Sequence, residues 1–140
     1  MDVSRATAIQ PDFVSCYVRI KKKFGIRDGC VTLEFTESFA YENYEYLSCV
    51  ISELHSAGFL CSLDDFGTGY SSFAVLKLLD FDEIKIDKSL LDRSSHPERD
   101  AILLQSIIGM IIRLDIKITQ EGVEDMDEFE MLEKMGCDVI

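Results

Sequence analysis

Short apolar segments alternate with longer amphipathic segments along the whole chain. Apolar residues recur at helical spacing in stretches that predict helices over residues 12–24, 44–54, 72–79, 97–114 and 128–135. Runs rich in apolar and β-branched residues predict strands over residues 31–35, 59–63, 83–86 and 116–119. Residues 1–4 have the pattern of the end of another strand, and Val139 with Ile140 that of the beginning of one. The pattern therefore predicts about six strands, two of them partial, with helices between them.

Glycine and proline mark several ends of the predicted helices. Gly58 follows helix 44–54 at the position where a left-handed cap is wanted, and Gly136 stops the last helix. Pro97 stands in the first turn of the long helix, where its missing N–H costs nothing. These residues support the predicted boundaries.

The alternation of strands and helices indicates βαβ units and a parallel sheet, either doubly wound or closed into a barrel. Four successive strands carry a charged residue inside or just after their apolar stretch: Glu34, Asp64, Lys85 and Glu121. In a (β/α)₈ barrel the carboxyl ends of all strands converge on one face, where the active site is built. No glycine-rich dinucleotide loop follows a strand in the sequence. The placement of charge therefore favours the barrel.

Composition and charge narrow the range of partners. The 140 residues are enough for one domain, and 47% hydrophobic with 29% charged residues is a globular balance. The formal net charge of −12 repels a phosphate backbone, so we expect no polymeric nucleic-acid partner. A small phosphorylated ligand remains compatible, because divalent cations invert the local sign of a carboxylate-rich site.

The five cysteines are odd in number and widely scattered, without a CxxC pair or a Cys/His cluster in the sequence. This spacing indicates neither a structural zinc site nor a disulfide framework, and favours small buried residues in a reducing cytoplasm. No stretch of the sequence has the ~20 apolar residues of a membrane helix or the pattern of a signal peptide. We therefore expect a cytoplasmic chain with no membrane span of its own, although a parent protein could be attached to a membrane.

Glu34 and Lys85 each interrupt an apolar strand that helices should cover. Burial of an unpaired charge costs several kcal/mol, so each must be paired, bound to a metal or placed at a wet cavity. A purely structural ion pair inside the barrel is the alternative to a functional role.

The adjacent carboxylates of Asp64 and Asp65 stand at a predicted strand end. They cannot both point the same way in extended backbone, yet both can reach metal ions above the barrel mouth. Two hard cations held by carboxylates suit phosphodiester hydrolysis. The glycines and serines that follow make a loop able to move over a ligand, although an ordinary turn with helix-capping serines fits them too. Glu121 and Glu124, after a later strand, fit either a general base or solvated loop charges.

The order and spacing of these motifs closely resemble the EAL family of cyclic di-GMP phosphodiesterases. The resemblance rests on five segments of the sequence: residues 34–38 (Glu-Phe-Thr-Glu-Ser), 64–72 (Asp-Asp-Phe-Gly-Thr-Gly-Tyr-Ser-Ser), 85–89 (Lys-Ile-Asp-Lys-Ser), 121–124 (Glu-Gly-Val-Glu) and 132–138. It implies a TIM-like (β/α)₈ barrel that hydrolyses the bacterial second messenger cyclic di-GMP to linear pGpG. It also implies a cofactor, Mg²⁺ or Mn²⁺, with two ions in the site and inhibition by Ca²⁺.

The resemblance assigns roles residue by residue. It implies metal ligands at Glu34, Asp64 and Asp65, a residue that holds the catalytic water or the phosphate at Lys85, and a general base or further metal ligand at Glu121. Glu37 and Glu124 resemble glutamates that support the site, and Glu37 is expected to anchor the loop that follows the paired aspartates. That loop comprises Phe66, Gly67, Thr68, Gly69, Tyr70, Ser71 and Ser72. The family associates the same loop with dimerisation, which makes a homodimer one expected arrangement.

The sequence also departs from the family pattern. Asp2 falls where the family has a metal-binding asparagine, and nothing corresponds to the Glu-Ala-Leu segment of the first strand or to the last strands. Residues 1–140 therefore resemble a partial EAL domain, which an excerpt, a natural truncation or completion by another chain would each explain. A second function follows from the missing glutamate, namely a catalytically inactive receptor for cyclic di-GMP or a protein-interaction platform. An unrelated Mg²⁺ barrel fits the carboxylates but not residues 64–72.

Overall fold

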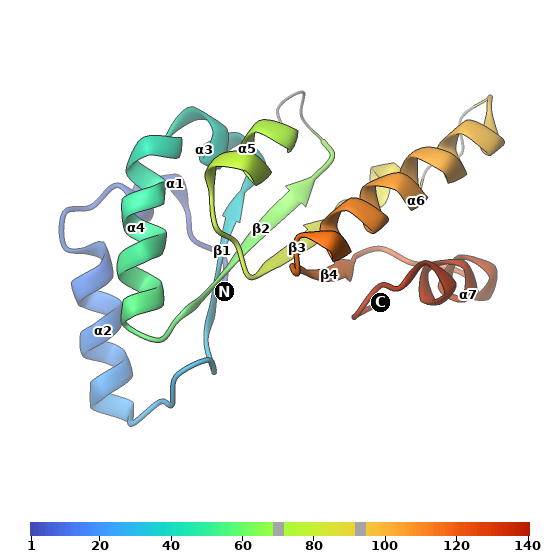
Figure 1. Ribbon diagram of the computed structural model, residues 1–140. Coiled ribbons are helices and arrows are strands. Elements are labelled where there is room, and N and C mark those ends of the chain that lie inside the picture. The colour runs from blue at the N-terminus through green and yellow to red at the C-terminus, as the bar shows by residue number, and fades with distance from the viewer. Residues whose placement is uncertain (69–71, 92–94) are drawn as a thin grey trace.

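Four parallel strands form one sheet in a computed structural model that describes residues 1–68, 72–91 and 95–140 (Figure 1). The strands follow one another in chain order: β1 (Thr32–Thr36), β2 (Leu60–Phe66), β3 (Glu83–Ile86) and β4 (Lys117–Gln120). The helices are α1 (Arg5–Ala8), α2 (Phe13–Phe24), α3 (Glu37–Glu42), α4 (Tyr44–Ser56), α5 (Ser72–Leu78), the 3₁₀ helix η1 (Lys88–Leu90), α6 (Pro97–Arg113) and α7 (Met126–Met135). This alternation confirms the predicted βαβ order and parallel sheet.

The two partial strands predicted at the ends of the chain lie at the two edges of the sheet. Asp2 forms a parallel bridge with Glu34 of β1, and Val139 forms one with Thr119 of β4. Each segment thus continues the order of the four central strands by one position. Six strand segments, two of them partial, therefore pair in sequence order, as consecutive strands of a barrel do.

The sheet has an apolar face and a polar face because side chains alternate along each strand. On β1, Leu33 and Phe35 are fully buried while Glu34 between them points to the other side; on β3, Ile84 is fully buried beside Lys85. Helices cover the apolar face, with α4 packed on β2 and α6 packed on β4 (Figure 1). The opposite face is left to the charged side chains.

Helices α1, α3 and η1 were not predicted from the sequence. Each is six residues or shorter, so it contains too few turns to show a helical period. α3 begins at Glu37, directly after β1, and buries Phe39 and Ala40. The five predicted helices occur with ends within two residues of those predicted.

The expectation that the cysteines are buried was wrong for Cys30 and Cys49, which are exposed. Cys61 is fully buried in β2, and Cys16 and Cys137 are half-buried. Cys30 lies in the turn before β1, where its side chain has no core to enter. Composition alone does not show which side of an element a cysteine occupies.

The longest helix, α6, carries isoleucines on more than one side. Ile108 and Ile111 are fully buried against the sheet, whereas Ile102 and Ile112 are exposed. Within residues 1–68, 72–91 and 95–140, no helix combines the length and the apolar character needed to cross a membrane.

Lys21, near the end of α2, has an almost fully buried side chain. Its Nζ donates hydrogen bonds to Asp28 Oδ1 at 2.6 Å and to the carbonyl oxygen of Ala57, and it lies 4.9 Å from the centre of the Phe59 ring. Gly58, with a φ of 76°, leaves room for this ammonium, since a Cβ there would lie 2.6 Å from Nζ. Lys21 therefore fastens α2 to the turn between α4 and β2.

We expect Lys21→Met to lower the free energy of unfolding by about 1–3 kcal/mol, because the Ala57 carbonyl loses a buried donor. Denaturant unfolding of both proteins measures the difference. The matched control is Lys22→Met on the exposed side of the same helix, which should change stability by no more than about 0.5 kcal/mol. Equal losses in the two variants would contradict the role given to Lys21.

Candidate active site

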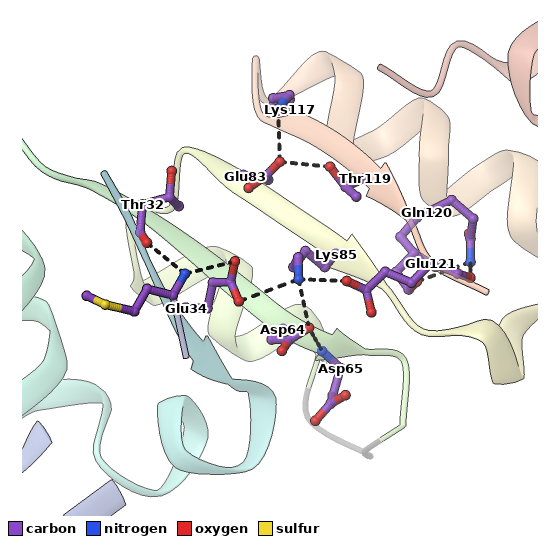
Figure 2. A network of polar contacts seen from close by, with 12 residues as sticks. Thr32, Glu34, Asp64, Asp65, Glu83, Lys85, Lys117, Thr119, Gln120 and Glu121 are labelled. Atoms are coloured by element: carbon purple, nitrogen blue, oxygen red, sulfur yellow. Dashed lines mark hydrogen bonds and ion pairs between the residues drawn. The ribbon is translucent and has the colours of Figure 1, made fainter. Parts of the chain in front are cut away.

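One ammonium group lies among three carboxylates on the polar face of the sheet (Figure 2). The Nζ of Lys85 on β3 is 2.6 Å from Oε1 of Glu121, 3.5 Å from Oε2 of Glu34 and 4.0 Å from Oδ1 of Asp64. The carboxylates come from β1, β2 and the segment after β4. Parallel pairing brings these four positions to one end of the sheet, as the sequence predicted.

The charge of Lys85 is strongly stabilised at this position. Burial alone would lower the pKa of the ammonium, but the hydrogen bond to Glu121 and the charges of Asp64 and Glu34 outweigh it and raise that pKa well above its usual range. The Lys85 side chain is only 18% exposed, so water screens these interactions weakly. Lys85 is consequently a permanent cation at the centre of the cluster.

Asp2, Glu34 and Asp64 form a group that is suited to a metal ion. One carboxylate oxygen from each lies within 4.8 Å of the others. The backbone sets this proximity, since Asp2 bridges to Glu34 and Asp64 pairs in register with Thr36, two residues after Glu34. Carboxylate oxygens are the donors that Mg²⁺ and Mn²⁺ prefer. The donor set therefore fits the cofactor expected from the sequence.

Asp65 takes a different position from its neighbour Asp64. Its backbone has a φ of 58°, in the left-handed region, and the pairing of β2 with β3 is irregular between Leu63 and Phe66. The exposed Asp65 carboxylate is not part of the three-carboxylate group, and its pKa is raised by partial burial and by the charges of Asp64 and Asp87. The structure thus brings Asp64 into the group and leaves Asp65 beside it.

The loop after β2 begins at a glycine fixed by a buried carboxylate. The backbone N–H of Gly67 donates to Oε2 of Glu37 at 3.0 Å, and the Glu37 side chain is 2% exposed. Gly67 has a φ of 103°, and a Cβ there would lie 2.3 Å from Cδ1 of Leu90 in η1. Phe66 is buried, and the Thr68 hydroxyl donates to the carbonyl of Asp65 at 2.9 Å. The start of the loop is therefore held from two sides.

The rest of the predicted loop is placed only in part. Gly69, Tyr70 and Ser71 lie outside the described residues, and Ser72 is described only as the first residue of α5. The other supporting glutamate, Glu124, is exposed and forms an ion pair with Lys88 Nζ at 2.5 Å. The hydrogen bond from Lys88 lowers the pKa of the Glu124 carboxyl.

A second polar cluster on the same face was missed in the sequence. Oε1 of Glu83 accepts hydrogen bonds from the Thr119 hydroxyl at 2.7 Å and from Lys117 Nζ at 3.0 Å (Figure 2). Glu83 lies two residues before Lys85, and Thr119 two residues before Glu121, so the two clusters stack along β3 and β4. The period of two was the available signal, because it places Glu83 on the face of Lys85.

The sequence matches a known family over its whole length. A family model described as EAL domain matches residues 1–140. The bifunctional diguanylate cyclase/cyclic di-GMP phosphodiesterase MucR of Pseudomonas aeruginosa is 38% identical over 105 residues, which make up 75% of this chain and 15% of that protein. The cyclic di-GMP phosphodiesterase PA2567 of the same species is 31% identical over 138 residues, or 98% of this chain and 23% of that protein.

The fold matches solved structures equally well. A structure of the PaMucR phosphodiesterase in complex with c-di-GMP has a TM-score of 0.87 and 31% identity over 97% of this chain and 55% of that chain. The likeness confirms an α/β fold of the TIM-like barrel type seen in EAL domains. The chain spans less than a quarter of the length of the two relatives named above.

Removal of the Glu37 carboxylate should release the start of the loop. A hydrogen bond to a charged group contributes about 1.5–3 kcal/mol, so in Glu37→Ala we expect amide hydrogen exchange at Gly67 to quicken at least about tenfold relative to the core amide of Ile84. NMR-detected exchange measures both amides. The control variant is Glu45→Ala, which removes an exposed carboxylate of α4. An unchanged ratio in Glu37→Ala would contradict the anchor.

Glu83 should contribute stability that depends on pH. Burial raises its pKa, but the hydrogen bonds from Thr119 and Lys117 outweigh this and lower the pKa below the ordinary 4.5. The stabilisation is therefore present above the unfolded pKa and is lost as the pH falls through the lower folded pKa. Denaturant unfolding should show Glu83→Gln less stable than the parent protein at neutral pH, with a gap that narrows below about pH 4.5.

Exposed Glu130, paired with Lys134 on one helix, supplies the matched control Glu130→Gln. This variant should track the parent protein within about 0.5 kcal/mol at every pH. A gap for Glu83→Gln that stays constant across the acid range would show that shape, rather than charge, accounts for the loss.

Proposed function

The chain belongs to the EAL domain family, and from this premise we propose that it forms part of a metal-dependent phosphodiesterase that hydrolyses cyclic di-GMP to linear pGpG. The observation that carries the proposal is the position of Lys85 among the carboxylates of Glu34, Asp64 and Glu121. Two of these carboxylates, Glu34 and Asp64, also belong to the group that could bind a metal ion. The names of the relatives support the substrate, since MucR and PA2567 are both named as cyclic di-GMP phosphodiesterases.

The residues proposed to hold the metal are Asp2, Glu34 and Asp64, with Asp65 as the adjacent ligand for a second ion. When bound there, Mg²⁺ or Mn²⁺ would supply Lewis-acid chemistry, a lowered pKa of water and stabilisation of developing negative charge. Ca²⁺ takes more oxygen ligands at longer distances, in agreement with the inhibition expected from the family resemblance. The net charge of −12 also favours cation binding before the dianionic substrate arrives.

Lys85 and Glu121 act directly in the proposed reaction. Because the Lys85 ammonium stays charged, it donates hydrogen bonds to the attacking water or to a phosphate oxygen and keeps that group in place. Glu121, directly after β4, lies within hydrogen-bond distance of Lys85. Its carboxylate takes the proton of the attacking water as a general base. The pair therefore positions the nucleophile and removes its proton.

Glu37 and Glu124 support the site from outside it. Glu37 accepts a hydrogen bond from the backbone N–H of Gly67 and so holds the start of the loop that follows β2. Glu124 forms an ion pair with Lys88. The Lys88 side chain packs so closely on Gly122 that a Cβ at that glycine would lie 2.7 Å from Lys88 Cβ. This packing orients the segment after Glu121. We further propose that residues 1–140 all belong to one such domain. The homodimer and the cytoplasmic location stay predictions.

The test of this function is hydrolysis of cyclic di-GMP by the chain in the presence of Mn²⁺, with the products separated by chromatography. We expect pGpG to form, and Glu121→Gln to reduce its rate at least about 100-fold, the usual contribution of a general base. Glu45→Gln, at an exposed position of α4, is the control that should keep the parent rate. Removal of the metal with a chelator should abolish the reaction.

Product formation that Glu121→Gln leaves unchanged would contradict the role of Glu121. An absence of product from the parent chain would contradict hydrolysis by these residues on their own. In that case, binding of cyclic di-GMP to the chain in a titration would support the alternative function, a non-catalytic receptor.

A further inference from the structure

A second group of potential metal ligands lies at the opposite ends of the strands from Lys85. His55 is in the last turn of α4, Cys61 is the second residue of β2, and Asp82 directly precedes β3. One ligand atom from each lies within 4.8 Å of the others. We propose that His55, Cys61 and Asp82 bind a transition-metal ion of the Zn²⁺ class, separately from the carboxylate site.

The chemistry of the donors selects the class of ion. An imidazole nitrogen, a thiolate sulfur and a carboxylate oxygen together match the ligands of Zn²⁺ and Co²⁺, whereas Mg²⁺ and Ca²⁺ bind oxygen donors. Three protein ligands leave the fourth tetrahedral position to water, as in zinc sites that are open to solvent. The site therefore differs in kind from the all-oxygen group at the other end of the sheet.

Two of the ligands are locked together by the backbone. The N–H of Asp82 donates to the carbonyl of Cys61 at 2.9 Å, and the N–H of Cys61 donates to Oδ2 of Asp82 at 2.7 Å. His55 completes the group, with Nε2 at 2.8 Å from the same Oδ2. A carboxylate that is hydrogen-bonded in this way is oriented before a metal arrives, which lowers the cost of binding.

An ion can reach this group from one side. The side chains of His55 and Asp82 are 28% and 33% exposed, while Cys61 beneath them is fully buried. Burial and the charge of Asp82 raise the pKa of the Cys61 thiol to about 12. Coordination must displace its proton, and binding should therefore strengthen as the pH rises.

The competing explanation is a hydrogen-bond network that only ties α4 to the sheet. In that case His55 and Asp82 need each other, but neither needs the sulfur of Cys61. A metal site needs all three donors at once. The thiolate is thus the group that separates the two explanations.

Co²⁺ titration of the full chain, kept reduced and initially free of metal, tests the proposal through the near-ultraviolet absorption of a sulfur–cobalt bond. We expect the band to saturate at one equivalent and to grow with pH. Cys61→Ser should abolish it, and His55→Gln should weaken Co²⁺ binding at least about tenfold. Addition of Zn²⁺ should displace Co²⁺ and raise the thermal midpoint of the parent protein.

Two controls separate this site from other donors. Cys49→Ser removes an exposed thiol and Glu34→Gln removes a ligand of the carboxylate group, and both should keep the band. An absent band in the parent protein, or one that survives Cys61→Ser, would overturn the proposal. A band that His55→Gln leaves at full strength would overturn the three-ligand site too. The sulfur–cobalt band is also measured in the parent protein and in His55→Gln, which changes a partly exposed residue. The proposal can therefore still be tested if Cys61→Ser does not fold.

Discussion

The arrangement of the polar face of the sheet depends on one constraint. The positive charge of Lys85 is only partly exposed to water and must be neutralised by neighbouring acids. Lys85 lies between two fully buried residues of β3, and its own side chain is only 18% exposed. An unpaired charge there would cost several kcal/mol. Glu34 of β1, Asp64 of β2 and Glu121 after β4 supply the compensation.

Parallel register is what makes this compensation possible. In the parallel ladder Lys85 pairs with Thr119 while Glu83 pairs with Lys117, so residues of equal rank on adjacent strands share a layer. The lower layer is organised around an anion, Glu83, and the upper one around a cation, Lys85. Charges of opposite sign thus alternate along β3, and each is contacted by the residue two positions beyond its register partner, Thr119 for Glu83 and Glu121 for Lys85. Helices α4 and α6 pack on the apolar face.

The sequence predicted the order of strands and helices and the residues that gather around Lys85. It did not predict the shortest helices or the distances between the charged groups. Glu34 and Lys85 were identifiable because a charge within an apolar strand needs a partner, although only the side-chain distances show that Glu121 lies closest to Lys85. The short helix α3 could not be predicted because six residues are too few to show a helical period. The left-handed backbone of Asp65 could not be predicted because the conformation of one residue leaves no periodic pattern in the sequence. Glu83 escaped because a charge at the first position of a strand is normally a solvated end.

The two ends of the sheet present different chemistry for a reason that lies in the strands themselves. At the carboxyl ends, successive strands point carboxylates toward a common axis, and the result is an all-oxygen group. At the amino ends the chain arrives from helices, so a helix residue, His55, meets a strand thiol, Cys61, and a loop acid, Asp82. Oxygen donors favour hard ions, while nitrogen and sulfur favour borderline ones. The sheet with its connecting helices and loops therefore presents an all-oxygen group at one end and a mixed nitrogen, sulfur and oxygen group at the other.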